Sequence, residues 1–255
     1  VDGLNNLGNA LSKIKKFDEA INYLNKALKL KPNFFETYYT LGEIFFEKGM
    51  YEQSLVKLNK ALDLKPGHLP TIKNKLKLLS KMNMKEEYLN FLEKVIPFHP
   101  KETDLYYKKA QVLSELGMNY QSLNTYKTIL MIDPEFPFVL GNVVNDKLKN
   151  CSWDGLERDL DDLKNKINEE KEIADPLLIS TLFDSTELLN KATKIWNKQY
   201  DVNDSQFKPL SFEKNSKINI GYFSADFRDH PIGHLIAEML ENHDKSKYEI
   251  YGFYL

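Results

Sequence analysis

Apolar residues along the first 136 positions recur at helical spacing, and the whole pattern returns every 34 residues. The prolines that follow each helical stretch recur at the same period, at Pro32, Pro66, Pro100 and Pro134. In the first unit the recurring positions hold Leu4, Leu7, Gly8, Leu11, Ala20, Leu24 and Ala27. The second and fourth units carry similar residues in phase, and the third is degenerate. A fixed period of this length predicts a stack of helix pairs.

The sizes of the residues within the period indicate how the helices pack. Small residues at the eighth and twentieth positions let two helices approach closely; they are Gly8, Gly42, Ala110, Ala20, Ser54 and Ser122. Gly49 and Gly117 are placed to end the first helix of a pair. The pattern is that of the tetratricopeptide repeat, and it predicts four repeats, at 1–34, 35–68, 69–102 and 103–136. Because one repeat cannot bury its own apolar face, we expect a curved α-solenoid with a concave groove.

The sixth position of each first helix is the candidate peptide-binding position, because first helices line the groove. It holds Asn6, Thr40, Asn74 and Lys108, and continuing the period gives Asn142. A column of amides can bind an extended peptide backbone without reading its sequence, since each amide both donates and accepts. The alternative is that Asn is simply common in this Lys- and Asn-rich chain. Spacing alone leaves both interpretations open.

After the repeats, the 34-residue pattern fades while helical periodicity persists. We expect a helical bridge over 137–200, in which Ser152 or Asp154 caps one helix. Trp153 and Trp196 are expected to anchor the packing between these helices. We assign every residue of this segment a structural role.

The last part of the chain changes character. Residues 201–216 are polar and are interpreted as a linker. A strand, the loop Ser224–His230, a helix opening at Pro231 and a second strand follow within 217–255. This order predicts a βαβ unit, the opening of a parallel sheet. In such sheets ligands bind beyond the carboxyl ends of the strands, which here is the loop.

His230 is the candidate catalytic residue of this loop. It would lie at the cap of the following helix, whose positive end favours neutral imidazole, able to accept a proton, and attracts phosphate. His234 lies one turn further on the same face, and Asp226 lies within the loop. The residues by themselves favour a simpler interpretation, in which His230 caps the helix and Asp226 stabilises the turn.

Composition narrows the classes of partner. The net charge of −2, with Arg158 and Arg228 as the only arginines, gives no reason to expect nucleic acid or a membrane surface. No segment reaches the ~20 apolar residues of a membrane-spanning helix. The single cysteine, Cys151, rules out an intrachain disulfide and any Cys-cluster zinc site, and no metal-spaced cluster is visible. A reducing compartment fits, so we expect a cytoplasmic protein.

The segment KINIGYFSADFRDHPIGHLIAEMLENHDKSKYEIYGFYL resembles the opening of the catalytic region of the O-linked N-acetylglucosaminyltransferase and SPINDLY family. NCSWDGLERDLDDL is similar to the segment that follows the repeats in that family, and ADPLLISTLFDSTELLNKATKIW is similar to the connecting helices of bacterial members. With the repeats, the resemblance covers essentially the whole chain. It implies a two-lobed GT-B type fold that transfers a sugar from a nucleotide donor, UDP-N-acetylglucosamine or similar, to Ser or Thr hydroxyls of proteins.

Individual residues carry the resemblance further. His230 matches the family's active-site histidine in the Asp-Phe-x-x-His-Pro segment, considered a general base and lining the donor and acceptor site. Asn6, Asn74 and Asn142 match the asparagine ladder that holds the acceptor backbone. Thr40 and Lys108 depart from the ladder, so the grip on the backbone is expected to be interrupted there.

The predicted fold is therefore mainly α: a tetratricopeptide solenoid, a helical bridge and the opening βαβ unit of a glycosyltransferase lobe. The predicted function is that of the N-terminal part of a protein O-glycosyltransferase whose groove recruits protein substrates. The family's second lobe would begin beyond Leu255, so we expect these residues alone to bind no cofactor, to bind a nucleotide sugar weakly and not to turn over. Further repeats are expected upstream. The alternative is a non-catalytic repeat scaffold, and the donor sugar and oligomeric state stay open.

Overall fold

The computed structural model describes residues 1–198, 217–227 and 229–254, with only the backbone of Tyr254. Contacts divide the chain into two compact units, Val1–Asp201 and Val202–Leu255, and each is described by itself. The predicted linker at 201–216 lies outside the described residues. None of the described helices is both long and apolar enough to cross a membrane.

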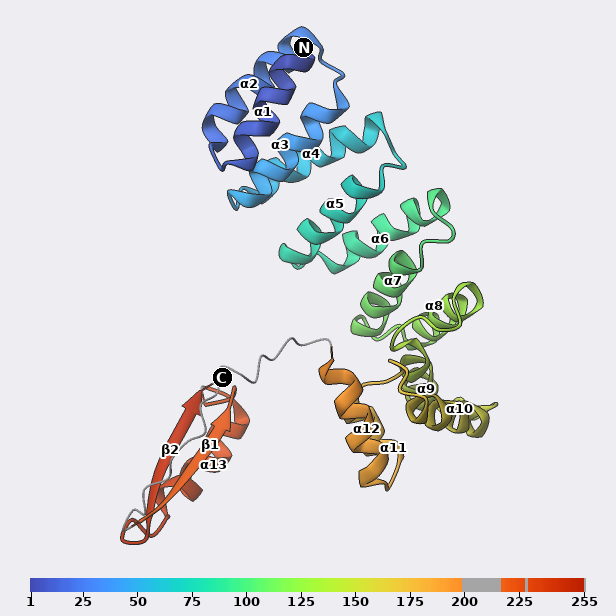
Figure 1. The fold of residues 1–255 in the computed structure, drawn as a ribbon, viewed down its shortest axis with the longest axis vertical. Helices are drawn as coiled ribbons and strands as arrows, with labels where there is room; N and C mark the ends of the chain where they lie inside the picture. The colour runs from blue at the N-terminus through green and yellow to red at the C-terminus, as the bar shows by residue number, and fades with distance from the viewer. Residues whose placement is uncertain (199–216, 228, 255) are drawn as a thin grey trace. The chain divides into compact units, whose positions relative to one another are not determined.

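The first unit consists of helices joined in pairs by short turns (Figure 1). The pairs are α1 (Asp2–Lys13) with α2 (Phe17–Leu30), α3 (Phe35–Glu47) with α4 (Tyr51–Leu64), α5 (Leu69–Lys81) with α6 (Lys85–Val95), and α7 (Thr103–Glu115) with α8 (Asn119–Ile132). Some first helices of successive pairs also contact one another: α1 contacts α3, and α3 contacts α5. The predicted helical solenoid is confirmed.

Each turn within a pair contains one residue in the left-handed conformation, and these residues repeat the 34-residue period. They are Lys15, Gly49, Asn83 and Gly117, with φ of 60°, 72°, 56° and 74°. Glycine adopts this conformation without steric cost, and the short polar side chain of asparagine tolerates it. The third pair therefore makes the same turn as the others although its residues match the repeat pattern less well.

Close approach within a pair depends on the small residues. A Cβ added to Gly42 would lie 2.6 Å from Leu58 Cδ2, and one added to Gly8 would lie 2.6 Å from Leu24 Cγ. The buried Ser54 hydroxyl donates to the Gly42 carbonyl at 2.7 Å, so the same position also binds the partner helix. Small side chains thus set the distance between helices in these pairs.

The third pair ends differently from the others. Its second helix, α6, ends at Val95, and the chain continues as a 3₁₀ turn, η1 (Ile96–Phe98). Pro97 within this turn has no backbone N–H to donate, which accounts for the early end of the α-helix.

The bridge consists of α9 (Val139–Lys149), α10 (Leu156–Asn168), α11 (Pro176–Leu182) and α12 (Thr186–Asn197). Their buried residues form one apolar cluster around Val144, Leu163 and Ile179. Asp175 caps α11, and Ser185 caps α12.

Two expectations for the bridge were wrong. Neither Ser152 nor Asp154 caps α10, because Gly155, with φ of 63°, is the residue at its N-cap. Trp153 does not anchor packing, since it is 65% exposed beside this turn. Trp196 does pack between helices, with its ring 4.9 Å from that of Phe138 in an edge-to-face arrangement.

The start of α9 is held tightly against the segment before α11. The Gly141 N–H donates to the Ile173 carbonyl at 3.0 Å. A Cβ added to Gly141 would lie 2.7 Å from Ala174 Cβ and 2.9 Å from the Ile173 carbonyl oxygen. Because one of these neighbours is backbone, only glycine fits at this position without moving the chain.

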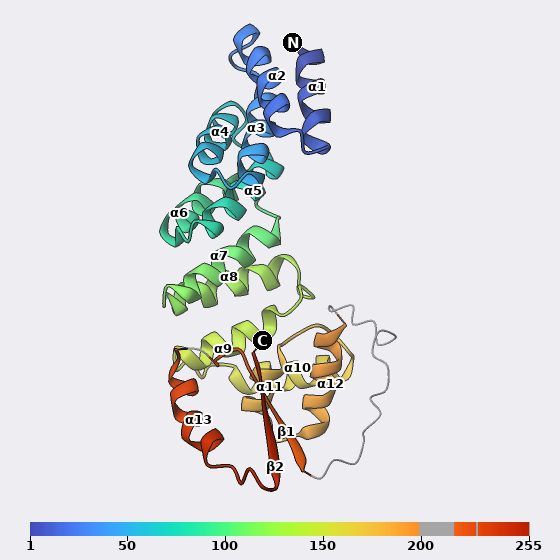
Figure 2. The same cartoon turned by 90° about the vertical axis from the view of Figure 1, so that its left-hand side faces the viewer.

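The second unit is a βαβ unit of β1 (Ile218–Ser224), α13 (Pro231–Glu241) and β2 (Tyr248–Tyr254), as predicted. Figure 2 shows the two strands side by side; they are parallel, with Ile218 opposite Tyr248 and Ser224 opposite Tyr254. Apolar side chains remain exposed on this unit, including Phe223 at 66% and Leu235 at 79%. No residue of α13 is buried.

Gly141→Ala is predicted to lower the free energy of unfolding by about 1–3 kcal/mol, the usual cost of inserting a methyl group into a packed site. Urea unfolding followed by circular dichroism measures it. Gly3→Ala is the matched control, because a Cβ there meets nothing within 4 Å and alanine favours the helix. Equal stability of the two variants would show that α9 is not packed as described.

Candidate functional site

A row of four hollows lies along the first helices, and each contains one sixth-position residue. We name them by that residue: the Thr40, Asn74, Lys108 and Asn142 hollows, of about 440, 140, 230 and 190 Å³. The Thr40 hollow also contains Asn9 of the preceding repeat, and the Asn74 hollow contains Glu43. Asn6 lies exposed on α1. The structure therefore places four of the five predicted ladder positions in hollows one repeat apart.

The ladder side chains also bind the repeat before their own. The Thr40 hydroxyl donates to Asn9 Oδ1 at 2.7 Å. Asn74 Nδ2 donates to Glu43 Oε1 at 3.0 Å and to the Tyr39 hydroxyl at 3.3 Å. With both amide hydrogens used in this way, the Asn74 carbonyl oxygen is the atom that remains for a peptide N–H.

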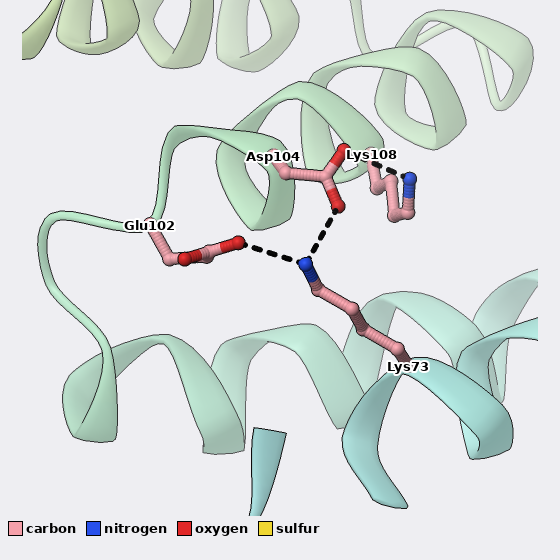
Figure 3. Close-up of polar contacts among 4 residues, drawn as sticks. All are labelled: Lys73, Glu102, Asp104 and Lys108. Atoms are coloured by element: carbon pink, nitrogen blue, oxygen red, sulfur yellow. Dashed lines mark hydrogen bonds and ion pairs between the residues drawn. The ribbon is translucent and has the colours of Figure 1, made fainter. Parts of the chain in front are cut away.

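Lys108 does not offer an amide, and its charge is held by neighbours (Figure 3). Its ammonium lies 3.0 Å from Asp104 Oδ1 on the same helix. Asp104 Oδ2 also lies 3.9 Å from the ammonium of Lys73, which donates to Glu102 at 3.0 Å. The hydrogen bond that Lys73 donates to Glu102 raises the pKa of Lys73. This network joins the third and fourth pairs across the ladder.

Aromatic rings and a histidine line the Thr40 hollow. His68 lies edge-on to Phe35 with ring centroids 4.6 Å apart, and the Tyr39 hydroxyl donates to Glu43 at 2.6 Å. Burial and the Glu43 carboxylate raise the pKa of Tyr39 to about 12. Burial and the nearby Lys65 ammonium lower the pKa of His68, whose Nδ1 caps α5 by accepting from the Thr71 N–H. The hollow thus presents neutral imidazole and phenol groups at pH 7.

In the second unit His230 is the N-cap of α13. Its Nδ1 accepts from the Ile232 N–H at 3.3 Å and lies 3.8 Å from Asp226 Oδ1. A neutral imidazole that accepts at Nδ1 carries its hydrogen at Nε2, so the free side of this ring donates. The structure brings Asp226 and His230 together, whereas His234 Nε2 lies 2.8 Å from Asp229.

One group around the ladder was not identified from the sequence. Tyr107, Phe138, Asp175 and Trp196 surround Asn142 in the fourth hollow. They come from segments far apart in the chain, and no linear spacing links them. Among the described residues no group of three or more His, Cys, Asp or Glu side chains is placed to hold a metal ion.

The comparisons with known proteins agree with this architecture. Residues 1–34, 35–68 and 103–136 match models of the tetratricopeptide repeat, and residues 185–255 match glycosyl transferase family 41. No curated protein matches the chain. The chain thus combines tetratricopeptide repeats with a segment similar to this glycosyltransferase family.

Solved structures support the fold alone. YrrB, described as a TPR protein with an unusual peptide-binding site, has a TM-score of 0.51 at 19% identity, covering 75% of this chain and 90% of its own. MamA from Desulfovibrio magneticus RS-1 has 0.50 at 18%, covering 63% and 91%. Another MamA structure has 0.52 at 17%, covering 79% and 98%.

The lowered pKa of His68 predicts a pH-dependent stability. As pH falls below the ordinary value of 6.5, the unfolded chain takes up a proton that the folded imidazole binds less readily. The contribution of His68 to the free energy of unfolding is therefore complete above pH 6.5 and declines below it. Urea unfolding at pH 7.5 and 5 measures the difference.

His68→Asn is the matched variant, because asparagine keeps a capping acceptor and does not titrate. It is expected to be less sensitive to pH than the wild type. NMR titration of the imidazole checks the pKa directly, and a value at or above 6.5 would contradict the assignment.

Proposed function

We propose that these residues are the acceptor-binding region of a protein O-glycosyltransferase, in which the groove of the repeats holds protein substrates for sugar transfer. The observation that carries the proposal is the occurrence, in one chain, of regularly spaced hollows and a segment that matches glycosyl transferase family 41. The donor is a nucleotide sugar, UDP-N-acetylglucosamine or a similar molecule, and the acceptors are Ser or Thr hydroxyls.

The groove binds acceptors through their backbone. Asn74 and Asn142 lie in hollows two repeats apart and are each held by a bond to a tyrosine of the preceding repeat. An amide fixed in this way is ready to bind a peptide without first losing rotamer freedom. The similarity to YrrB, which is described as having a peptide-binding site, supports this use of the fold.

His230 acts at the donor or acceptor in this proposal. Its Nε2–H is free to donate to a phosphate or hydroxyl oxygen, while Nδ1 is occupied by the helix cap. The N-terminus of α13 adds a favourable field for negative charge. To accept a proton at Nε2, the ring would have to adopt the other tautomer and release the Ile232 N–H. Positioning is therefore the role that this geometry supports best.

A non-catalytic scaffold is the second candidate. The first unit has its own apolar clusters in the repeats and the bridge. An assay of sugar transfer by the native protein distinguishes the two candidate functions. A glycosyltransferase transfers sugar to the peptides that it binds, whereas a scaffold binds peptides and transfers no sugar.

Replacing Asn6, Asn74 and Asn142 together by Ala is predicted to weaken peptide binding at least about tenfold, because each lost hydrogen bond contributes ~1 kcal/mol. Fluorescence anisotropy with a panel of extended Ser- and Thr-containing peptides measures the dissociation constants. Circular dichroism melting monitors the fold, since Asn74 also binds the preceding repeat.

The matched control replaces Asn22, Asn25 and Asn59 by Ala, which are exposed on second helices. It removes the same number of amides outside the groove and is expected to bind peptides as the wild type does. Equal peptide binding by both triple variants would show that Asn6, Asn74 and Asn142 do not bind the peptide.

His230→Ala and His230→Asn separate chemistry from capping. Asparagine keeps an N-cap acceptor, so only alanine is expected to destabilise α13, by about 1 kcal/mol. If the imidazole takes part in transfer, both variants of the native protein lose turnover by at least ~10²-fold. Transfer of a radiolabelled sugar measures this. Normal turnover in His230→Asn would restrict His230 to the cap.

A further inference from the structure

The Asn142 hollow differs from the other three in charge, because lysines line each of the others and none is among its described lining residues. It is lined by three aromatic side chains and one carboxylate, from Tyr107, Phe138, Trp196 and Asp175, together with Asn142. These residues come from α7, the N-cap of α9, the last turn of α12 and the N-cap of α11. All are half-buried, so the hollow is walled but open to solvent.

The aromatic rings are fixed by their neighbours. Phe138 and Trp196 meet edge to face with centroids 4.9 Å apart. The Tyr107 ring packs against those of Tyr126 and Phe136, with centroids 5.9 and 5.6 Å away. Each ring presents an electron-rich face that attracts cations, and a cluster of such faces recognises ammonium groups.

Asp175 adds a negative charge that has no cationic partner among the described residues. One of its oxygens, Oδ1, accepts from the Leu178 N–H at 2.9 Å, and no Lys or Arg among the described residues forms an ion pair with it. By contrast, Lys65 pairs with Glu36 in the Thr40 hollow. The Asp175 charge reaches into the hollow, since it contributes, after burial, to the raised pKa of Tyr107.

Phe138 has a left-handed backbone conformation that the local sequence does not account for. Its φ is 61° and its ψ is 0°, a left-handed geometry that is unfavourable for a bulky residue. It stands at the N-cap of α9 without a side-chain cap bond, where Ser, Asp or Asn would satisfy the helix better. Backbone strain of this kind collects at ligand clamps, and here it places the ring against Trp196.

We propose that the Asn142 hollow binds the cationic side chain of a lysine or arginine in a peptide that lies along the groove. The ammonium or guanidinium group contacts the faces of Phe138 and Trp196 and pairs with the second oxygen of Asp175. Asn142 binds the peptide backbone beside it. The inference rests on the proposed function, and it adds side-chain selection to a groove that otherwise grips only backbone.

The test compares peptides that differ at one residue, lysine or its uncharged isostere norleucine, scanned through a Ser- and Thr-containing sequence. At the position that occupies the hollow, the wild type is expected to bind the lysine peptide about tenfold more tightly. Asp175→Asn keeps a capping acceptor for α11 and is expected to abolish this preference. Asp161→Asn, an exposed residue on α10, makes the same charge change elsewhere and should retain it.

The outcomes separate this inference from the proposed function. If lysine and norleucine peptides bind equally at every position, the cation site is wrong while the groove stands. A preference that survives in Asp175→Asn would also overturn it. If no peptide binds, the proposed function fails, and a small cation then tests the hollow by itself.

That second measurement uses tetramethylammonium and n-butylammonium with Trp153→Phe, which leaves Trp196 as the only tryptophan. A saturable change in Trp196 fluorescence that Asp175→Asn removes would support a cation site. If this fluorescence change occurs although no peptide binds, the cation site exists but the proposal that a peptide supplies the cation is overturned. No saturable change would overturn the cation site itself.

Discussion

The rest of the structure depends on one constraint: no helix pair of the repeats can bury its own apolar face. The cluster around Leu62, Ile72, Leu92 and Leu105 draws its members from four successive helices, α4 to α7. Burial therefore requires neighbours to stack in one register, and small residues such as Gly42 set how closely they stack. The spacing of the hollows follows from this packing, because each hollow contains a residue of a first helix whose position in the stack the core determines.

Polar contacts across the stack divide into two kinds. The Lys108 ammonium pairs with Asp104 and the Lys73 ammonium with Glu102, so the charges of this part of the groove are neutralised within the protein. The side-chain amides of Asn74 and Asn142 are each positioned by a single neighbouring repeat, and they can still form hydrogen bonds with a ligand. The groove is thus uneven along its length. Its last hollow, where the repeats meet the bridge, carries the Asp175 carboxylate, which caps α11 and forms no ion pair within the described part of the chain.

Most of the fold could be predicted from the sequence because its helices and strands follow from periodic patterns of apolar residues. The 34-residue repeat located the helix pairs, and the alternation of strand, loop and helix located the βαβ unit. Local backbone geometry was harder to predict: Gly155 rather than Ser152 or Asp154 is the N-cap of α10, and Pro97 ends α6 early. Trp153 shows that a large apolar residue need not be buried. The Asn142 hollow could not be found at all, since Phe138, Asp175 and Trp196 meet only after four bridge helices pack.

The bonds from Thr40 and Asn74 to the repeat before each have a thermodynamic consequence. A ligand that occupies several hollows spans the interfaces between neighbouring repeats. Its own contacts with the protein are lost when those repeats separate. Occupancy and cooperative melting are then linked quantities. An extended ligand present at 100 times its dissociation constant would stabilise the array by about 2.7 kcal/mol. The denaturation midpoint of the repeats is therefore expected to rise with the number of interfaces between repeats that a ligand spans. A short ligand confined to one hollow would leave distant repeats able to unfold locally.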